Sequence, residues 1–535
     1  MSGAFGLWRQ ALKTACLGAT SVLALAGAAC AEPVKAVVDS GALVGEVADG
    51  VATFKGIPFA APPVGALRWR PPAAPQPWTG ERDATRFGAG CPQKDGPDKG
   101  GPQTSSEDCL FLNVWTPAEH PAGASLPVMV WIHGGGWRNG HGSDPAFDGK
   151  AFVHDGVVLV TVNYRLGALG FFAHPALTRE AAPDAPLGNY GLMDNIAALE
   201  WVKRNVAAFG GDPRRVTVFG ESAGGGQVLS LLTVSRAKGL FQQAIVESGP
   251  AFGLPRGLAA QEKSGVDLAV RLGLPQDASA DALRAIKPET LVETPTDAAP
   301  FIDGRLVKQL PQAVFEAGRN AHVPLIIGTN SDEGSLTPYY ASAADQTMAL
   351  YRLRAATDTL RASYGADAPD AATLRRWAFA DTIFGAPARK IATEASSAAP
   401  VFLYRFGYVR QDQQGRRPGA AHGSEMVFAF DTLATAHAPA DPKDEAVAKT
   451  MHGCWASFAK TGRPACPDAA AWPAYDAKRD TLMLFGADGA VRPVADYDKP
   501  SFDFIQHTML DPPLPSMEAV QAEVKQGVPA SGEAR

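Results

Sequence analysis

The chain has 535 residues, of which 46% are hydrophobic and only 19% are charged, so it is able to bury a large core. Its 49 basic and 55 acidic residues give a net charge of −6, without a dense run of lysine or arginine. This composition disfavours intrinsic disorder, and it gives no electrostatic reason to expect nucleic acid or an anionic membrane as a partner.

The first 31 residues have the pattern of a secretory signal peptide. A basic start precedes a mostly apolar run over residues 15–29, and small residues lead to Ala31. The run is too short for a comfortable membrane span, so the pattern predicts cleavage after Ala31 and export to the periplasm or the medium. Acylation of Cys30, as in a lipoprotein, is the alternative, although Gly27 stands where a bulky aliphatic residue is expected. No later stretch offers about 18 uninterrupted apolar residues, so we expect no membrane span in the mature chain.

Four cysteines would remain after cleavage: Cys91, Cys109, Cys454 and Cys466. An even number in an exported protein favours disulfides, and four cysteines allow three pairings. Local pairing is the simplest arrangement, and the first bridge would then close a loop rich in glycine and proline. Four buried free thiols are the alternative.

No linker or internal repeat divides the remaining chain, so we expect one domain over residues 32–515 and a polar, flexible tail over 516–535. Segments 258–300 and 348–399 have helical spacing and predict helical insertions over the sheet. Short aliphatic runs recur at residues 128–132, 157–162, 216–219, 324–327 and 401–406. Since these runs are apolar at consecutive positions, they predict strands covered on both faces, as in a parallel sheet.

One helix between these strands can be placed by its signals. Asp194 and Asn195 are predicted to cap a segment with an apolar face, and the glycines at 210 and 211 are predicted to stop it. The next aliphatic run follows directly, so the order is helix and then strand.

A serine stands at the corner where the run 216–219 meets a group of glycines. Gly220 and Gly224 lie two positions either side of Ser222 and leave room for a sharp strand-to-helix turn, in which the apex residue takes a positive φ. A helix that begins at Ala223 directs free N–H groups and its positive dipole end towards an oxygen that becomes negative. The pattern therefore predicts Ser222 as a nucleophile that attacks a carbonyl carbon.

A glycine triplet follows another aliphatic run, in the sequence Trp-Ile-His-Gly-Gly-Gly-Trp over residues 131–137. Residues without a Cβ atom can turn their amides into a cavity and let a substrate approach the main chain. We expect the amides of Gly135, Gly136 and Ala223 to form an oxyanion hole. A tight loop without a catalytic role is the alternative for the triplet.

These motifs and their order resemble the type B carboxylesterases, the cholinesterase-like branch of the α/β-hydrolases. The resemblance covers almost the whole mature chain and includes residues 54–60, 62–65, 106–114, 163–165 and 188–224. It implies an α/β-hydrolase fold, with a mostly parallel central sheet, helices on both faces and helical insertions over the active site. It also implies a disulfide between Cys91 and Cys109, which leaves Cys454 for Cys466.

The resemblance also locates an acid and a histidine, which spacing alone does not. Glu333 follows the run 324–327 and matches the triad acid of the family, with Asp332 as the neighbouring alternative. The histidines after Glu333 are His422, His437, His452 and His507. Of these, His422 matches the His-Gly-x-Glu segment of the family. The resemblance implies that His422 is the general base and that Glu333 orients its imidazole.

Two further residues near the motifs are expected to support the site. His133 belongs to the glycine loop, and we expect it to contribute packing or a hydrogen bond rather than act as a base. Glu221 precedes the serine, matches many members of the family, and is expected either to bias charge and order water near Ser222 or to make a structural hydrogen bond.

Together these features predict an exported serine hydrolase that cleaves carboxylic esters of small molecules through an acyl-enzyme, with the triad Ser222, Glu333 and His422. No H-E-x-x-H motif or zinc-spaced Cys/His cluster is present, so we expect neither a metal nor an organic cofactor. An amidase or thioesterase with the same triad is the alternative, and a non-catalytic cholinesterase-like binding protein is disfavoured because all three side chains are present. The substrate and the oligomeric state stay open.

Overall fold

The computed structural model describes residues 32–96, 101–121, 123–250, 256–296, 298–337, 357–365, 370–436 and 438–510. The segment predicted as a signal peptide, the tail from residue 516 and His437 lie outside these residues. Among the described helices, none combines the length and the apolar character that a bilayer crossing needs.

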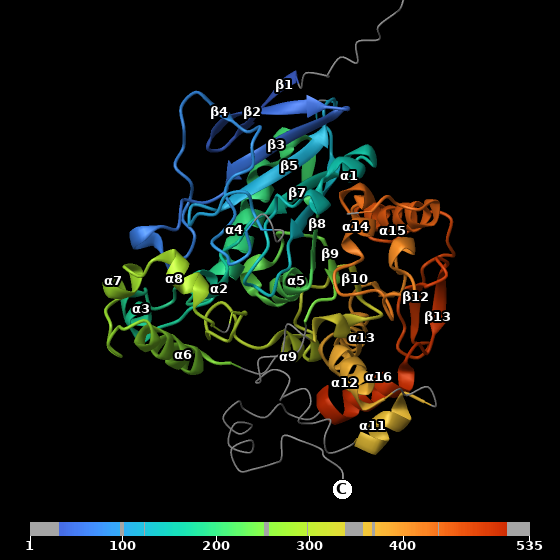
Figure 1. Cartoon of the computed structure of the whole chain (residues 1–535). Helices are drawn as coiled ribbons and strands as arrows, with labels where there is room; N and C mark the ends of the chain where they lie inside the picture. Colours follow the sequence, from blue (N-terminus) through green and yellow to red (C-terminus); the bar gives the residue numbers. More distant parts are fainter. Residues whose placement is uncertain are drawn as a thin grey trace, which may run out of the picture.

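One sheet of 13 strands runs through the molecule, from β1 near the top of Figure 1 to β13 at the right. Its strands follow the order β1-β2-β3-β5-β7-β6-β8-β9-β10-β11-β12-β13, and β4 pairs with β2 beside this path. Their bounds are β1 Glu32–Val38, β2 Gly41–Ala48, β3 Val51–Pro58, β4 Glu81–Asp83, β5 Phe111–Pro117, β6 Leu126–Ile132, β7 Val158–Val162, β8 Gly211–Glu221, β9 Gln243–Glu247, β10 Leu325–Asn330, β11 Val401–Phe406, β12 Thr481–Phe485 and β13 Val491–Ala495.

Neighbouring strands from β7 to β12 are all parallel, whereas the pairs at the two ends of the path are antiparallel. The five aliphatic runs form β6, β7, β8, β10 and β11, so the mostly parallel sheet predicted from the sequence is confirmed. Because parallel strands end at the same edge, the loops after β6, β8, β10 and β11 meet on one side of the sheet.

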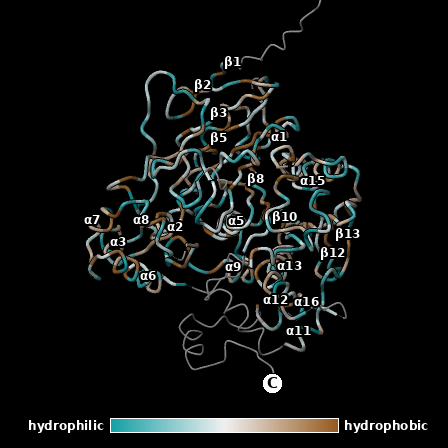
Figure 2. Tube along the Cα trace, in the orientation of Figure 1, coloured by the Kyte–Doolittle hydropathy of each residue, from teal (hydrophilic) through white to brown (hydrophobic). Residues whose placement is uncertain are grey.

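Both faces of the central strands are covered, which explains their consecutive apolar residues. In β6, Val128 and Val130 belong to one core cluster, and Met129 and Trp131 belong to a second cluster. The first cluster includes side chains of α4 and α5, and the second includes side chains of α15. Apolar stretches accordingly recur along the central strands in Figure 2.

The helices are α1 Lys150–His154, α2 Gly167–Gly170, α3 Pro175–Glu180, α4 Tyr190–Asn205, α5 Ala223–Thr233, α6 Leu258–Arg271, α7 Ala280–Arg284, α8 Pro288–Glu293, α9 Pro311–Glu316, α11 Thr357–Ser363, α12 Ala371–Ala380, α13 Ala386–Ala395, α14 Met426–Ala429, α15 Pro442–Thr461 and α16 Lys499–Ile505. The first predicted insertion holds α6, α7 and α8, which gather with α3 at the left of Figure 1. The described part of the second insertion holds α11, α12 and α13, at the lower right.

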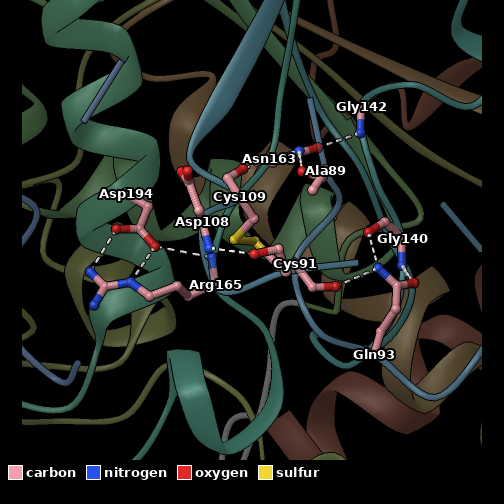
Figure 3. Close-up of a disulfide and its surroundings, with 11 residues drawn as sticks. Ala89, Cys91, Gln93, Asp108, Cys109, Gly140, Gly142, Asn163, Arg165 and Asp194 are labelled. Atoms are coloured by element: carbon pink, nitrogen blue, oxygen red, sulfur yellow. Dashed lines mark hydrogen bonds and ion pairs between the residues drawn. A yellow bond between two sulfur atoms is a disulfide. The ribbon is translucent and has the colours of Figure 1, made fainter. Parts of the chain in front are cut away.

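The predicted start of α4 is wrong. The helix begins at Tyr190 with Asn189 as its N-cap, and Asp194 lies inside it. Asp194 is fully buried, and its carboxylate receives the guanidinium of Arg165 at 2.7 and 2.8 Å (Figure 3). An acidic residue that holds a buried ion pair resembles a cap when only the sequence is known. The predicted stop is close to the observed one, since the chain leaves the helical region at Gly210 with φ 75°.

Two disulfides join the cysteines in local pairs. Cys91 and Cys109 are bridged at 2.05 Å, as Figure 3 shows, and Cys454 and Cys466 at 2.03 Å. The first bridge is buried beside β5, and the second joins α15 to the segment that follows it.

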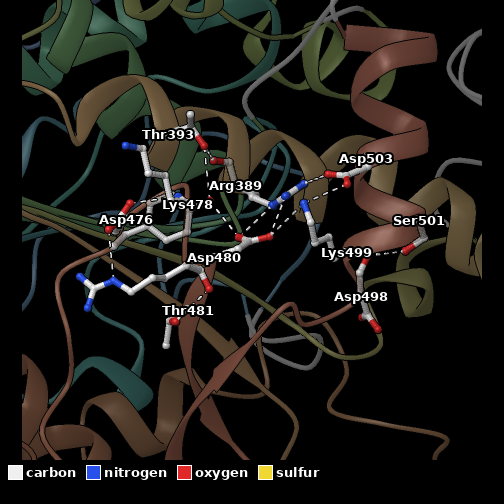
Figure 4. Close-up of polar contacts among 12 residues, drawn as sticks. Arg389, Thr393, Asp476, Lys478, Asp480, Thr481, Asp498, Lys499, Ser501 and Asp503 are labelled. Atoms are coloured by element: carbon white, nitrogen blue, oxygen red, sulfur yellow. Dashed lines mark hydrogen bonds and ion pairs between the residues drawn. The ribbon is translucent and has the colours of Figure 1, made fainter.

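A polar cluster joins α16 to α13 and to the start of β12 (Figure 4). Arg389 of α13 donates to Asp480, which precedes β12, at 3.0 Å and to Asp503 of α16 at 2.6 Å. Lys499 contacts the other oxygen of Asp503 at 2.9 Å. Arg389 and Asp480 are both buried, so this charge pairing satisfies groups that would be costly to leave alone.

Candidate active site

Ser222 stands at the corner between β8, which ends at Glu221, and α5, which begins at Ala223. Its φ is 53° and its ψ is −123°, a strained conformation for a residue with a side chain. A Cβ atom on Gly220 would lie 2.6 Å from the carbonyl oxygen of Ile132, and one on Gly224 only 2.0 Å from it. The two glycines therefore let β6 pack directly under the turn, which holds Ser222 in place.

The glycine loop after β6 reaches the same corner. Gly135 and Gly136 have φ values of 96° and 61°. A Cβ atom on Gly134 would lie 3.1 Å from the Cβ atom of Ser222, so the loop touches the serine. Within the described part of the chain, the amides of Gly135, Gly136 and Ala223 donate no hydrogen bond. These three N–H groups are thus available to an oxygen bound beside Ser222.

Glu333 lies just after β10, and His422 lies in the loop that follows β11; their side chains are in contact. The imidazole Nδ1 of His422 lies 2.5 Å from Oε2 of Glu333. The other carboxylate oxygen accepts from the hydroxyl of Ser248 at 2.5 Å and from the amide of Asn330 at 2.7 Å. Burial alone would raise the pKa of Glu333, but His422 and these hydrogen bonds hold it below its usual value. The carboxylate is therefore ionised and fixed, and it orients the ring.

Asp332, the alternative acid, is engaged elsewhere. Its two oxygens accept from Arg376 of α12 at 2.9 and 2.5 Å. Its backbone N–H donates to the carbonyl of Ala420 at 2.8 Å, which ties the acid loop to the histidine loop. Asp332 thus braces the loop that presents Glu333 to His422.

The second ring nitrogen of His422 faces the serine corner. Nε2 lies 3.1 Å from Oε1 of Glu221, the residue directly before Ser222. Nε2 makes no hydrogen bond to Ser222 or to any other group among the described residues. The structure therefore brings His422 to the turn that carries Ser222, with Nε2 paired with the carboxyl of Glu221.

Buried carboxyls in this part of the site interact with His422 or with one another. Burial raises the pKa of Glu247 to about 8, against the indole N–H of Trp455, which donates to it at 3.0 Å. Burial also raises the pKa of Glu221 and of Glu425, and the positive His422 opposes both shifts. Burial disfavours the charged imidazole, but Glu221 and Glu333 outweigh it and raise the pKa of His422 to about 9. The ring is thus poised to carry a proton.

The other histidines have structural surroundings. His133 is buried and stacks on Tyr164 with ring centroids 4.5 Å apart, and burial lowers its pKa to about 3. This arrangement agrees with a packing role. His452 bonds the carbonyl of Ala429 at 2.9 Å within the second core cluster, and the exposed His507 bonds a carbonyl of its own helix at 2.6 Å.

Sequence reasoning missed three residues that contact the site. Ser248 directly follows β9, with a φ of 47°, and β9 pairs with β8 in the parallel sheet. Its place at the end of a strand next to β8 could have identified it, had the order of the strands been known. Arg376 lies in a helical insertion, and no local pattern connects it to Asp332. Phe384 packs its ring 5.2 Å from that of His422, from a π-helical turn over Asp381–Gly385. Such turns occur frequently at functional sites.

Known proteins are similar to this chain in sequence. A model of the carboxylesterase family matches residues 33–502. The fumonisin B1 esterase of Sphingopyxis macrogoltabida is 38% identical over 483 residues, which cover 84% of this chain and 85% of the relative. The para-nitrobenzyl esterase of Bacillus subtilis is 37% identical over 476 residues (83% and 93%), and the human cocaine esterase is 36% identical over 477 residues (81% and 83%).

Solved structures agree with the sequence matches. A PNB esterase superposes with a TM-score of 0.76 at 32% identity, over 88% of this chain and 99% of the other. A carboxylesterase of Geobacillus stearothermophilus superposes with the same TM-score at 33% identity and the same coverage. The chain therefore has the α/β-hydrolase fold, and it belongs to the carboxylesterase family of carboxylic ester hydrolases.

Proposed function

We propose that this chain hydrolyses carboxylic esters through an acyl-enzyme formed on Ser222, with His422 as general base and Glu333 as the acid that orients it. The oxyanion is held by the amides of Gly135 and Gly136 together with that of Ala223. Neither a metal nor an organic cofactor takes part in this mechanism.

Acylation begins when the Ser222 hydroxyl attacks the ester carbonyl carbon and passes its proton to Nε2 of His422. The carbonyl oxygen becomes negative and enters the hole, where each preorganised amide contributes about 3 kcal/mol to the transition state. Glu333 stabilises the imidazolium, because its carboxylate lies 2.5 Å from Nδ1. The imidazolium then protonates the leaving alcohol, which departs and leaves the acyl group on Ser222.

Deacylation repeats these steps with water as the nucleophile. His422 takes a proton from the water, the hydroxide adds to the acyl carbon, and the same amides receive the second oxyanion. Collapse of this intermediate breaks the bond to the serine oxygen, which recovers the proton from His422. The carboxylic acid is released and the enzyme returns to its initial state.

The observation that carries the proposal is the strained corner at Ser222, with φ 53°, beneath the glycine loop and beside the Glu333–His422 pair. The test is Ser222→Ala, with hydrolysis of p-nitrophenyl acetate and labelling by a fluorophosphonate as readouts. We expect both to be lost while the circular dichroism spectrum and the Tm stay unchanged. A Ser222→Ala protein that keeps wild-type turnover would disprove the assignment of the nucleophile.

We propose that the preferred substrates are esters of bulky alcohols. The support is the family relationship to esterases named for para-nitrobenzyl, cocaine and fumonisin B1, together with the exposed main chain at Gly135, which leaves the hole open. A panel of esters that varies the acyl and alcohol parts separately measures this preference through kcat/KM, and a matched amide and thioester series separates esterase from amidase and thioesterase activity. A preference for small alcohols would contradict the proposal.

We also propose that the chain is exported. The support is the signal-like pattern over residues 1–31 and the presence of two disulfides, which persist in oxidising compartments. Mass spectrometry of the protein recovered from the periplasm or medium should give an N-terminus at Glu32. An acylated Cys30 would instead identify a lipoprotein, and recovery of the protein only from the cytoplasm, with an intact Met1, would contradict export.

A further inference from the structure

The loop closed by the Cys91–Cys109 disulfide contacts the far end of the oxyanion loop. Both cysteines are buried, with 1% and 0% of their surface exposed, and the bridge brings their Cα atoms to 4.9 Å. Residues 91–96 extend from this bridge to residues 139 and 140, which follow the glycine triplet, its tryptophan and Arg138 in the sequence. Figure 3 shows the bridge, Gln93 and Gly140 in one view.

Gln93 binds both backbone groups of Gly140. Its Oε1 accepts from the amide N–H of Gly140 at 2.9 Å, and its Nε2 donates to the carbonyl oxygen of Gly140 at 2.9 Å. The same Nε2 also donates to the carbonyl of Cys91 at 3.1 Å. A primary amide has the one donor and one acceptor that this two-sided contact requires, and few other side chains have both at this reach.

Two further contacts flank this clamp. Asp95 accepts from the side-chain amide of Asn139 at 2.8 Å. Asn163 accepts from the N–H of Gly142 at 2.8 Å and donates to the carbonyl of Cys109 at 3.1 Å. Asn139 and Gly140 are thus held directly by the disulfide loop, and Gly142 is held to Cys109 through Asn163.

The clamped residues pack against the residues that form the hole. The carbonyl of Gly135 accepts from the amides of Arg138 and Asn139 at 3.0 Å each, which closes a tight turn. A Cβ atom on Gly135 would lie 2.2 Å from the carbonyl oxygen of Asn139, and one on Gly140 would lie 2.3 Å from Nδ1 of His133. A movement of residues 139–140 therefore has to move residues 133–135 as well, because there is no free space between them.

We propose that Gln93 is a positioning residue for the oxyanion hole, and that the Cys91–Cys109 loop is the frame from which it holds the amides of Gly135 and Gly136 in the direction of the developing charge. This inference rests on the proposed function of these amides. It extends that function by assigning a catalytic contribution to a loop that carries no reacting group.

The primary test compares Gln93→Ala with wild type, with rates expressed per active site titrated by a fluorophosphonate. We expect kcat for p-nitrophenyl acetate to fall about tenfold or more, because misaligned donors lose transition-state stabilisation, while KM changes less than about twofold. The inhibition constant of a trifluoromethyl ketone, which adds to the serine and forms an oxyanion, should rise by the same factor as kcat/KM falls. Gln261→Ala is the control, since Gln261 of α6 also donates its side-chain amide to a backbone carbonyl, at 3.2 Å, and is buried away from this loop.

A second variant, Gln93→Glu, separates positioning from general stability. The ionised carboxylate can accept from Gly140 but repels its carbonyl, whereas the protonated carboxyl supplies a donor and an acceptor again. We expect the ratio of variant kcat to wild-type kcat to be low at neutral pH and to rise as the pH falls towards about 4.5. If Gln93→Ala does not fold, this ratio decides the question alone, and a ratio that stays flat with pH overturns the proposal.

The two disulfides give a further matched pair. The double variant Cys91→Ala, Cys109→Ala should have a lower kcat per titrated site. The double variant Cys454→Ala, Cys466→Ala should have a lower Tm and an unchanged kcat. Equal kcat in both double variants, or an unchanged inhibition constant in Gln93→Ala, would overturn the positioning role. Labelling of Ser222 in every variant keeps this outcome distinct from a failure of the proposed nucleophile.

Discussion

The two sides of the active site are held together by different forces. On the nucleophile side, main chain packs on main chain, because the turn at Ser222 lies against the end of β6 with no space for a Cβ atom at Gly220 or Gly224. On the acid and base side, side chains connect the loops after β10 and β11. Ser331 and Ser335 accept there from the amides of Ala420 and His422, at 2.9 Å each.

Because of this difference, we expect the two sides to control two separate properties of the enzyme: stabilisation of the oxyanion and the dependence of the rate on pH. Steric contact fixes the backbone around Ser222 in one conformation. We therefore expect this side of the site to determine how strongly the oxyanion of the transition state is stabilised. Hydrogen bonds and charges on the other side respond to ionisation, so we expect that side to set how the rate depends on pH. The variants below test this division, from the largest expected effect to the smallest.

Glu333→Gln should have the largest effect. The amide keeps the shape of the side chain but cannot stabilise the imidazolium or fix the correct tautomer, so kcat should fall about 10⁴-fold. Steady-state hydrolysis of p-nitrophenyl acetate measures the change. Asp332→Asn is the control, and it should fall much less because Asp332 contacts Arg376 rather than His422. A larger loss of kcat in Asp332→Asn than in Glu333→Gln would instead identify Asp332 as the triad acid.

Gly224→Ala should have the next largest effect, on the other side of the site. The new methyl group would lie 2.0 Å from the carbonyl oxygen of Ile132, so the turn that carries Ser222 has to move. We expect kcat to fall about 10²- to 10³-fold and the free energy of unfolding to fall by about 2–4 kcal/mol. Urea denaturation and kinetics measure the two changes. Gly257→Ala, where nothing lies within 4 Å of the new Cβ atom, should leave kcat unchanged and lower the free energy of unfolding by no more than about 1 kcal/mol, because Gly257 is the N-cap of α6.

The same division explains what could be predicted from the sequence. The turn at Ser222, the proposed nucleophile, could be predicted because its requirements are local: glycines at fixed distances around Ser222, an aliphatic strand before it and a glycine triplet after β6. The parallel sheet could be predicted for the same reason, since consecutive apolar residues record burial on both faces.

The proposed acid and base, Glu333 and His422, could be selected from the sequence only through the family resemblance. Asp332 and Arg376 are 44 residues apart, and Ser248 and Glu333 are 85 apart, so no local pattern connects them. The predicted start of α4 was wrong for a related reason. Asp194 is not a helix cap but pairs with Arg165, which lies 29 residues away in the sequence. Charges satisfied by distant partners leave no periodic signal in the sequence.

Arg376→Ala should have a smaller effect than either substitution above. It removes the two hydrogen bonds that brace Asp332, so the loop before Glu333 gains freedom while the triad itself stays intact. We expect kcat to fall about tenfold, since poorer alignment of a catalytic pair costs less than its loss. Kinetics per titrated site give the measurement. Arg375→Ala, at the neighbouring exposed position, should leave kcat unchanged, and an equal loss there would point to a general effect on α12.

Glu221→Gln should change the pH dependence more than the rate. The Glu221 carboxylate lies 3.1 Å from Nε2 of His422 and helps to raise the pKa of this histidine to about 9. Only the neutral imidazole can accept the serine proton, so activity is lost as the pH falls below that pKa.

Removal of the carboxylate lowers the pKa of His422, which shifts the acid limb of the kcat/KM profile to lower pH by about one unit. The plateau at high pH should fall by only a few fold, since Glu333 still stabilises the imidazolium. Measurement of kcat/KM from about pH 5 to 10 follows both features. A shift to higher pH would contradict the electrostatic role of Glu221. A comparable shift in an active Gly224→Ala protein would show that steric contact and charge do not act separately in this site.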